Sequence, residues 1–129
     1  MKNIILISLL FFAFFSCTQQ KEIAKSKAVV QAVSVDSTEY EIMIIDPDFD
    51  TWYLVNFAPS LDRSDDYYRL RNTVAVNNWN HYYISGRYSR IIGSHIHYVP
   101  STDYGIEVNR KLYWFFKYYE EKFRVPLFK

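Results

Sequence analysis

The 129-residue chain is poor in glycine and cysteine, with three glycines and one cysteine. Three scattered glycines leave no glycine-rich loop for a phosphate or a dinucleotide, because such loops need several closely spaced glycines. The sequence also lacks the Gly-x-Ser-x-Gly elbow of many serine hydrolases. A single cysteine excludes a disulfide within the chain, so an exported form must fold by its core alone. These absences remove the usual settings for phosphate binding and nucleophilic catalysis.

The chain also lacks an excess of charge of either sign. It has 15 Lys and Arg against 14 Asp and Glu. Removal of residues 1–16 would take away Lys2 and no acid, which leaves a net charge of zero. Nucleic-acid binding needs a basic surplus to neutralise phosphates. We therefore expect no nucleic-acid partner and no polybasic membrane patch, and we predict no cofactor.

The first 16 residues have the organisation of an export signal. Met1–Asn3 provides a short positive start, and the run Ile4–Phe15 is apolar except for Ser8. A transmembrane helix needs about 20 apolar residues, so this run is too short to cross a bilayer. Its length and flanks are typical of a secretory signal peptide. Ser16 supplies the small residue that a signal peptidase needs.

The stretch Phe14-Phe15-Ser16-Cys17 resembles the lipobox of bacterial lipoproteins, which ends in a small residue and the acylated cysteine. It departs from the usual pattern because Phe14 replaces leucine and Phe15 replaces a small or β-branched residue. The resemblance implies that Cys17 carries diacylglycerol and a further acyl chain such as palmitate, which together anchor the protein stably in a membrane. An ordinary secretory signal followed by an incidental cysteine is the alternative.

The resemblance also predicts location and domain limits. We expect residues 1–16 to be a lipoprotein signal peptide, 17–38 a lipidated N-terminus with a flexible tether, and 39–129 a single domain. The protein would then lie in the cell envelope, facing the periplasm or the cell surface. Thr18 stands where many inner-membrane lipoproteins have aspartate, which favours the outer membrane. An alternative for part of the tether is an edge strand or short helix at 28–35.

Residues 39–129 carry an unusual aromatic load, with all 12 tyrosines and all three tryptophans. A small domain buries a modest fraction of its surface, and each aromatic side chain buries about 150–250 Å². The aromatics are therefore expected to form the core. An exposed aromatic platform for sugar rings or a partner is the alternative, with Trp52, Trp79 and Tyr104 as its candidate residues.

Two segments have the composition of strands. Residues 40–46 are rich in β-formers and end at Pro47, and residues 91–99 alternate between apolar and polar side chains. Because helical segments separate them, a right-handed crossover would make them parallel neighbours. The sequence thus predicts an α+β domain with a small two- to three-stranded sheet, two to three helices and an aromatic-rich core.

Three segments have helical patterns. Asp48 or Asp50 is placed to cap a short helix that carries Trp52, Leu54 and Val55. A longer helix is expected from Ser64 or Asp65 to Tyr82, ended by Ser85-Gly86, with a break near its middle because four asparagines lower its helix propensity.

The last helix is expected to start after Asp103 as N-cap and to reach Phe123. Its apolar residues recur at spacings of three and four, and Glu107 lies near the positive end of the helix dipole. Asn109 and Arg110 are expected on the solvated side. The apolar tail 125–128 is expected to fold back onto the domain.

A second resemblance rests on Tyr40-Glu41-Ile42, Ile45-Asp46-Pro47, Trp79-Asn80 and the run from Asp103 to Asn109, together with Phe49 and Trp52. This combination is similar to a family of short uncharacterised lipoproteins from Bacteroidota-type bacteria. It covers residues 40–123. The family implies a location and a domain extent but no activity.

Asp46, Asp48 and Asp50 form the Asp-x-Asp-x-Asp pattern that begins a calcium loop. An EF-hand also needs glycine at the sixth position and glutamate at the twelfth, where this chain has Thr51 and Phe57. The pattern therefore does not encode an EF-hand. A turn and helix-capping role is the favoured interpretation.

His95 and His97 would lie on one face of the expected strand, about 7 Å apart, which suits two ligands of one metal. A third ligand would come from Asp46, Asp48, Asp103 or Glu107. The alternative is a pair of partly exposed strand histidines. Asp50 and Glu107 could serve as the two carboxylates of a glycan hydrolase only if folding brought them across a cleft.

These patterns favour a membrane-anchored envelope lipoprotein that acts as a non-enzymatic binding or accessory module. Its expected partners are the membrane, through Cys17, and an envelope protein or glycan. One alternative is an envelope hydrolase or metal-binding protein that uses His95 and His97 with nearby carboxylates. Another is a structural homo-oligomeric subunit whose interface buries Trp52, Trp79 or Trp114.

Overall fold

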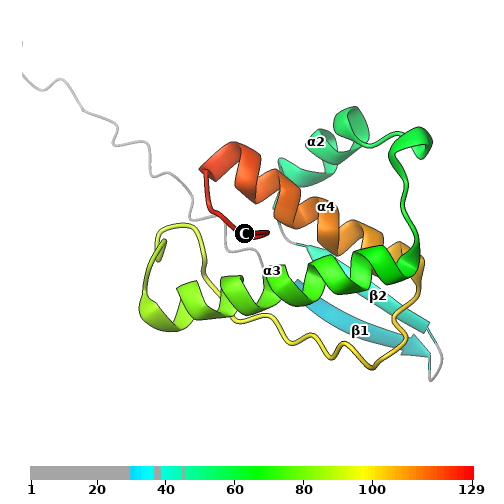
Figure 1. Ribbon diagram of the computed structural model, residues 1–129, viewed down its shortest axis with the longest axis horizontal. Coiled ribbons are helices and arrows are strands. Elements are labelled where there is room, and N and C mark those ends of the chain that lie inside the picture. Colours follow the sequence, from blue (N-terminus) through cyan, green and yellow to red (C-terminus); the bar gives the residue numbers. More distant parts are fainter. Residues whose placement is uncertain (1–29, 37–38, 45) are drawn as a thin grey trace, which may run out of the picture.

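The computed structural model describes residues 30–36, 39–44 and 46–129. The predicted export signal, the predicted lipobox and Cys17 lie outside these residues. The elements are β1 (Val30–Asp36), β2 (Glu39–Ile44), α2 (Phe49–Asn56), η1 (Pro59–Leu61, one 3-10 turn), α3 (Asp65–Ser85) and α4 (Ile106–Phe123). Figure 1 shows α4 in the middle of the body, with α2 on one side and α3 on the other.

The two strands form an antiparallel hairpin ahead of the helices. Val30 pairs with Ile44 at its open end, and the register shifts between Ser34 and Asp36. Residues 30–36, which we expected to belong to the tether or to an edge strand, form β1. β2 covers most of the segment 40–46 that has strand composition. The hairpin contacts the helical body where β2 packs against α4.

The predicted α+β class is wrong, because the body from Asp46 to Lys129 is built from helices and contains no strand. The segment 91–99, expected as a second strand beside 40–46, consists of turns and extended loop. The alternation in this segment does match burial, because Ile92 and Ile96 are buried while residues 93, 95 and 97 are exposed. However, the side chain of Asn80 occupies both backbone hydrogen-bonding groups of Ile96. The alternation of buried and exposed residues therefore comes from a loop that lies against α3.

Helix α4 is the hub of the body, because α2, α3 and β2 each pack against it. The helix begins at Ile106 after Gly105, so the prediction of Asp103 as N-cap is wrong; Asp103 Oδ1 instead accepts the N–H of Gly105 at 3.1 Å. Contact on several sides explains its wide buried surface, which consists of Val108, Asn109, Leu112, Phe115, Phe116, Tyr118 and Tyr119.

Helix α3 runs unbroken for 21 residues, so the predicted break near its middle is wrong. Its ends match the prediction: Ser64 Oγ accepts the N–H of Tyr67 at 3.2 Å, and Gly86 closes the helix with φ 71°. A left-handed residue at this position suits glycine, which has no Cβ to clash. Helix α3 tolerates its asparagines because their side chains bind other parts of the protein, as described below.

The tail after α4 folds back onto the body as predicted. Val125 and Leu127 are fully buried. Glu120 Oε1 accepts the N–H groups of Leu127 and Phe128, both at 2.9 Å. One side chain thus satisfies two backbone donors where the chain reverses.

Tryptophan, tyrosine and phenylalanine dominate the core. Trp79 packs edge-on against Tyr119 with ring centroids 5.0 Å apart, and Phe49 packs edge-on against Phe115 at 5.7 Å. Such tilted arrangements are the favoured geometry for aromatic pairs. None of the helices in the described part of the chain is both long and apolar enough to span a bilayer.

Candidate functional site

The best-developed charged cluster joins the α2–α3 connection to α4. Arg110 donates to both oxygens of Asp62, from Nε to Oδ1 at 2.9 Å and from Nη2 to Oδ2 at 2.6 Å. Its third nitrogen, Nη1, lies 2.8 Å from Glu107 Oε1. Tyr68 donates its hydroxyl to Asp62 Oδ1 at 2.7 Å. The guanidinium carbon lies 5.6 Å from the ring centre of Phe57. We call these residues the Arg110 clamp.

The electrostatics of the Arg110 clamp keep its groups in fixed ionisation states. Hydrogen bonds from Arg110 and Tyr68 lower the pKa of Asp62 to about 2. The hydrogen bond to Asp62 raises the pKa of Arg110 above its already high value. Burial and the bond to Asp62 raise the pKa of Tyr68. A general acid or base needs a pKa near the working pH, so the cluster is suited to holding the α2–α3 connection in place.

A second charged cluster surrounds the start of α2. Asp46 is buried, with 4% of its surface exposed, and its Oδ1 accepts the N–H of Asp48 at 3.0 Å. Tyr118 donates to the same oxygen at 3.3 Å, and Lys122 Nζ lies 2.6 Å from Asp48 Oδ2. Asp48 is the N-cap residue of α2 without a side-chain cap bond, and Asp50 lies in the first turn. Asp46 thus takes the turn role that the sequence predicts for this acidic triplet.

The opposite end of α3 binds the loop that joins α3 to α4 by neutral groups. Trp79 Nε1 donates to the carbonyl of Ser94 at 2.8 Å. The Asn80 amide donates to the carbonyl of Ile96 and accepts its N–H, both at 2.8 Å. Tyr82 binds the tail after α4 instead, and its hydroxyl donates to the carbonyl of Pro126 at 2.9 Å. Trp79 and Asn80 replace the strand pairing that the loop sequence suggests.

A polar network also crosses the centre of the body. Asn72 Nδ2 donates to the Asn109 carbonyl at 2.8 Å. Asn109 Nδ2 donates to Asp65 Oδ1 at 2.7 Å, while its Oδ1 accepts the hydroxyl of Tyr98 at 3.0 Å. Burial raises the pKa of Tyr98 to about 12, so the phenol stays a donor. The prediction that Asn109 faces solvent is wrong, because its buried side-chain amide has hydrogen-bond partners at both its nitrogen and its oxygen.

The structure does not gather the predicted metal-site residues. His95 and His97 are both exposed and lie on the loop after α3, with the His95 ring centre 6.3 Å from that of Tyr83. The described residues include no group of three or more histidine, cysteine, aspartate or glutamate side chains placed to share a metal ion. The paired-histidine metal site therefore stays a prediction without a third ligand in the described part of the chain.

The aromatic residues predicted to bind a ligand lie in the body itself. Trp79 is fully buried and Tyr104 is nearly so. Trp52 is partly buried and packs against Trp114 with ring centroids 6.1 Å apart. None of these rings forms an open platform, because each is packed against other aromatics or donates within the core.

The two carboxylates considered for glycan hydrolysis are engaged separately. Asp50 Oδ1 lies 3.6 Å from Lys111 Nζ on α4. Glu107 is exposed and pairs with Arg110. Each acid thus has its own cation. The prediction that Arg110 is solvated is wrong, since only 12% of its side chain is exposed.

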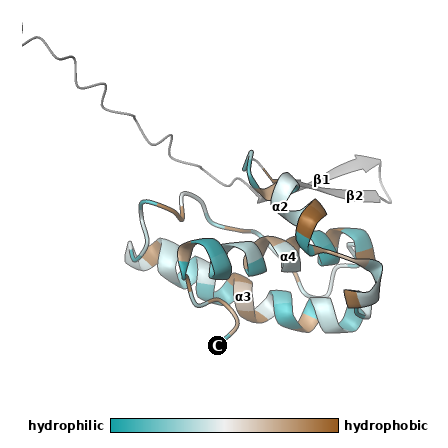
Figure 2. Ribbon diagram, turned by 90° about the horizontal axis from the view of Figure 1, so that it is seen from above, coloured by the Kyte–Doolittle hydropathy of each residue, from teal (hydrophilic) through white to brown (hydrophobic). Residues whose placement is uncertain are grey.

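Helix α2 presents aliphatic side chains to the outside. Leu54 is 80% exposed and Val55 is 79% exposed, and Leu61 on η1 is half exposed. We call these three residues the α2 surface. Figure 2 shows a hydrophobic turn of ribbon in α2. The opposite side of α2 buries Phe49, so the helix is apolar on both sides, a pattern typical of helices covered on both sides.

A second exposed surface lies at the far end of α3. It consists of Tyr83, Ile84, Arg87 and Arg90, all exposed, and we call it the basic end. Residues 67–102 contain four arginines and no aspartate or glutamate. This acid-free stretch is the sequence signal for the surface, and a charge count over the whole chain conceals it.

The fold and these contacts define a small helical body, rich in aromatics, with two distinct exposed surfaces. The chain belongs to a family of unknown function, DUF6146, whose model matches residues 4–129. The match includes the apolar run, Cys17 and the whole described body. No curated protein and no solved structure matches the chain significantly.

Proposed function

We propose that this protein is a lipid-anchored protein of the bacterial cell envelope, whose helical body is a non-enzymatic module that binds another envelope protein. The observation that carries the anchor is the apolar run 4–15 followed directly by Ser16 and Cys17. The family model spans this segment together with the body, which supports treating both as parts of one protein.

The α2 surface supports a binding role for the body. Two neighbouring aliphatic side chains with about four fifths of their area exposed are costly to leave in water, since burying each contributes about 1.5–3 kcal/mol. Exposed apolar patches of this kind mark interaction sites. The exposed residues are aliphatic, whereas sugar rings stack on flat aromatic faces. This favours a protein over a glycan as the partner.

The anchor is tested by the intact mass of the protein isolated from membranes of cells that express the full chain. The proposal predicts a mature chain that begins at Cys17 and carries the added mass of a diacylglycerol and an acyl chain. A Cys17→Ser variant should lack the lipid mass, whether or not its signal peptide is removed. A mature wild-type chain with an unmodified Cys17 thiol would contradict the anchor.

The binding role is tested by a photo-crosslinking residue placed at position 54 in the full chain. Position 70 is the matched control, because Leu70 on α3 is 67% exposed and lies outside the α2 surface. We expect crosslinking in cells to one defined protein from position 54 and none from position 70. A product of twice the chain mass would instead support the homo-oligomeric alternative. Equal products at both positions would contradict a specific surface.

A further inference from the structure

We propose that the basic end docks on the surface of an anionic lipid bilayer, so that the body lies against the membrane with α3 ending at the headgroups. The proposal deepens the proposed function, because the lipid anchor would keep the body close to a bilayer. It names a second contact of the body, which is separate from the α2 surface.

The loop that follows α3 holds its arginines in a defined turn. Ser89 donates its N–H to the Gly86 carbonyl at 3.3 Å, and Ile91 donates to the Tyr88 carbonyl at 2.8 Å. Ile92 is buried and fixes the loop to the core. Tyr88 has φ 63°, a left-handed conformation that non-glycine residues rarely adopt. The turn is therefore a built structure that presents Arg87 and Arg90 to solvent.

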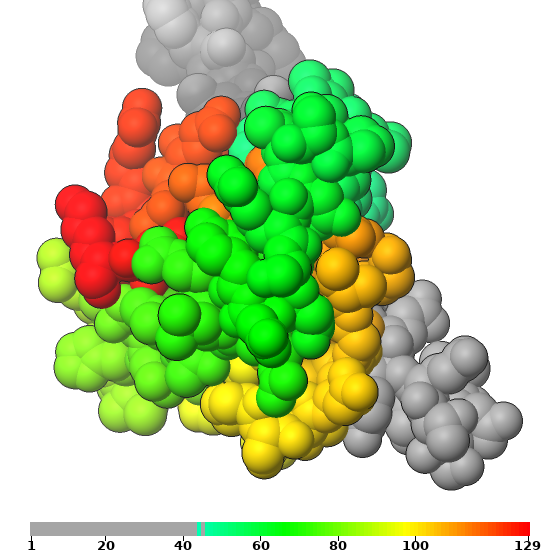
Figure 3. Space-filling model, turned by 45° about the vertical axis from the view of Figure 1, so that its right-hand side comes forward, coloured from blue at the N-terminus to red at the C-terminus, as the bar shows by residue number. Residues whose placement is uncertain are grey.

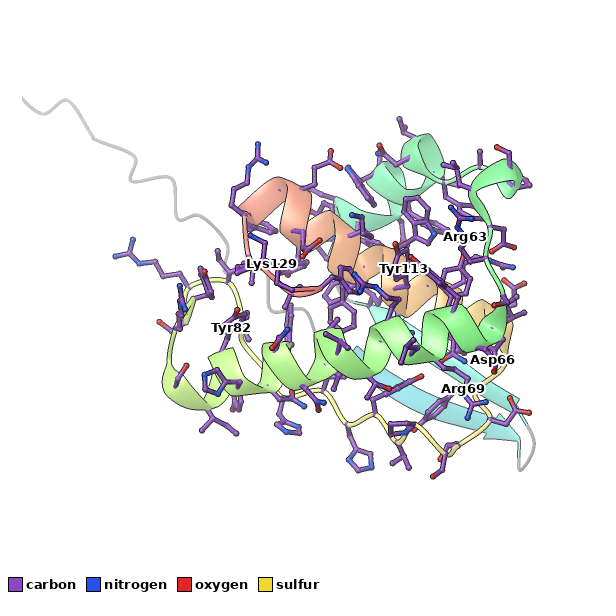
Figure 4. All side chains as sticks on the ribbon, in the orientation of Figure 1. Arg63, Asp66, Arg69, Tyr82, Tyr113 and Lys129 are labelled. Carbon is purple, nitrogen blue, oxygen red and sulfur yellow. The ribbon has the colours of Figure 1, made fainter. Side chains whose placement is uncertain are left out.

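The guanidinium group of Arg87 is oriented by two aromatic rings. Its central carbon lies 5.6 Å from the ring centre of Tyr82 and 5.2 Å from that of Tyr88. The two rings meet edge to face at 5.1 Å, and Tyr82 is fixed by its bond to the Pro126 carbonyl. Figure 4 shows Tyr82 toward the end of α3 that lies away from Asp66 and Arg69. A guanidinium held in this way keeps its N–H groups free for phosphate oxygens.

The charge of this end is not compensated locally. No carboxylate pairs with Arg87 or Arg90 among the residues that the structure describes. By contrast, residues 46–66 contain six aspartates and a single arginine. Figure 3 shows the yellow-green surface of the α3 end and the blue-green α2 region on different sides of the molecule. An anionic sheet of headgroups would attract the first surface and repel the second.

The apolar residues of the basic end suit a lipid interface. Ile84 is 78% exposed and Tyr83 is about half exposed, and both precede the arginines by a few residues at the same end of α3. Tyrosine rings with their polar tips are enriched at the headgroup level of membranes. Aliphatic side chains next to arginines on one surface are the pattern of interfacial segments, which combine apolar insertion with attraction to anionic lipids. An acidic protein surface would match the arginines but would leave Ile84 without an apolar environment.

The test uses the full chain, anchored in vesicles, with one spin label. Cys17 is the only cysteine and would carry lipid, so Ile84→Cys introduces a unique free thiol for a nitroxide. Leu54→Cys is the matched control, because Leu54 has the same exposure at the other end of the body. The readout is the collision rate of the label with oxygen and with a water-soluble nickel chelate. Vesicles of phosphatidylethanolamine with phosphatidylglycerol are compared with vesicles of phosphatidylcholine.

We expect the label at position 84 to become shielded from nickel and accessible to oxygen only in phosphatidylglycerol vesicles, while the label at 54 stays in water. Arg87→Gln with Arg90→Gln should lower the ratio of docked to undocked protein by about 30-fold, since each arginine near an anionic surface contributes about fivefold. Raising the salt concentration should weaken docking in the same direction, because salt screens exposed charges.

Three outcomes would overturn the proposal. They are equal nickel accessibility at positions 84 and 54, equal shielding in neutral and anionic vesicles, or shielding at 84 without any vesicle, which would indicate a contact with protein. Failure of the anchor is separable from these. If Cys17 proves unmodified by mass, the same measurement with Cys17→Ser in both labelled chains still decides whether the basic end docks.

Discussion

The two ends of the helical body are held by different chemistry. At the α2 end, the Arg110 clamp joins the α2–α3 connection to α4 by a two-pronged ion pair to Asp62. At the other end, Trp79 and Asn80 bind the loop after α3 through neutral hydrogen bonds to its backbone. One end therefore depends on ionisation and the other does not.

This difference explains which charges are available to a partner. Arg110 forms ion pairs with Asp62 and Glu107, so its charge is not available to a partner. The loop after α3 is fixed by the Trp79 indole and the Asn80 amide, and in the described part of the chain neither Arg87 nor Arg90 forms an ion pair. Because neutral groups hold this end, the charges of Arg87 and Arg90 remain available to a partner. The expectation of no polybasic membrane patch followed from the balanced total charge, which averages over two unlike ends.

The largest expected loss of stability comes from removing the Trp79 side chain, which holds the loop after α3. Trp79→Ala removes a fully buried indole together with its bond to Ser94. Truncation of buried tryptophan costs about 3–5 kcal/mol of unfolding free energy. Urea unfolding followed by circular dichroism measures the loss. Trp79→Phe keeps most of the volume and should cost clearly less. Equal losses for the two variants would show that packing contributes little at this position.

The next effect isolates the neutral hydrogen bonds. Asn80→Ala should lower the unfolding free energy by about 2 kcal/mol, because both backbone groups of Ile96 lose their partner. Asn77→Ala is the matched control on the same helix, since Asn77 is exposed. The control should stay within about 0.5 kcal/mol of wild type. The role of Asn80 in holding the loop would be refuted by indistinguishable unfolding curves for the two variants.

A smaller effect, present at neutral pH and lost in acid, should come from the Arg110 clamp. The pKa of Asp62 is about 2 in the folded protein, below its ordinary value of 3.8. A depressed carboxyl pKa contributes stability above the unfolded pKa, and this contribution is lost as the pH falls from about 4 toward 2. Asp62→Asn should therefore be less stable than wild type at neutral pH, with the gap closing in acid. Asp66→Asn, at an exposed residue, serves as the control.

The smallest effect on stability is expected at the α2 surface. Leu54→Ser should change the unfolding free energy by no more than about 0.5 kcal/mol, because the side chain already lies in water. The same change should abolish crosslinking to the partner when the photo-crosslinking residue is placed at position 55 instead of 54. A stability loss well above this range, with a dependence on protein concentration, would indicate that a second copy covers the surface.

The sequence predicts local features well where a local group decides them. Ser64 and Gly86 mark the ends of α3, because an N-cap hydroxyl and a left-handed glycine act within one turn. The return of the tail follows from its apolar residues. The apolar spacing in α4 correctly selects most of its buried face.

The errors have a common origin in polar groups that find distant partners. Asn72, Asn80 and Asn109 look like surface residues or helix breakers in the sequence, yet each binds a segment far along the chain. Sequence patterns do not identify such partners, so tertiary contacts override propensity. The same effect turned the alternating segment 91–99 into a loop instead of a strand. The sequence did not predict the α2 surface, because apolar residues on both sides of a helix normally indicate that both sides are buried.

Hydrogen exchange of the wild-type protein at pH 6 and pH 2 tests most directly whether the two ends are held by different chemistry. The measured rates are corrected for the intrinsic effect of pH. We expect the amide of Arg63, which donates to Asp62 and Tyr68, to lose most of its protection at pH 2, where Asp62 becomes protonated. The amide of Ile96, which donates to Asn80, should keep its protection. Equal losses at both amides would contradict the account, because both ends would then depend on the same charges.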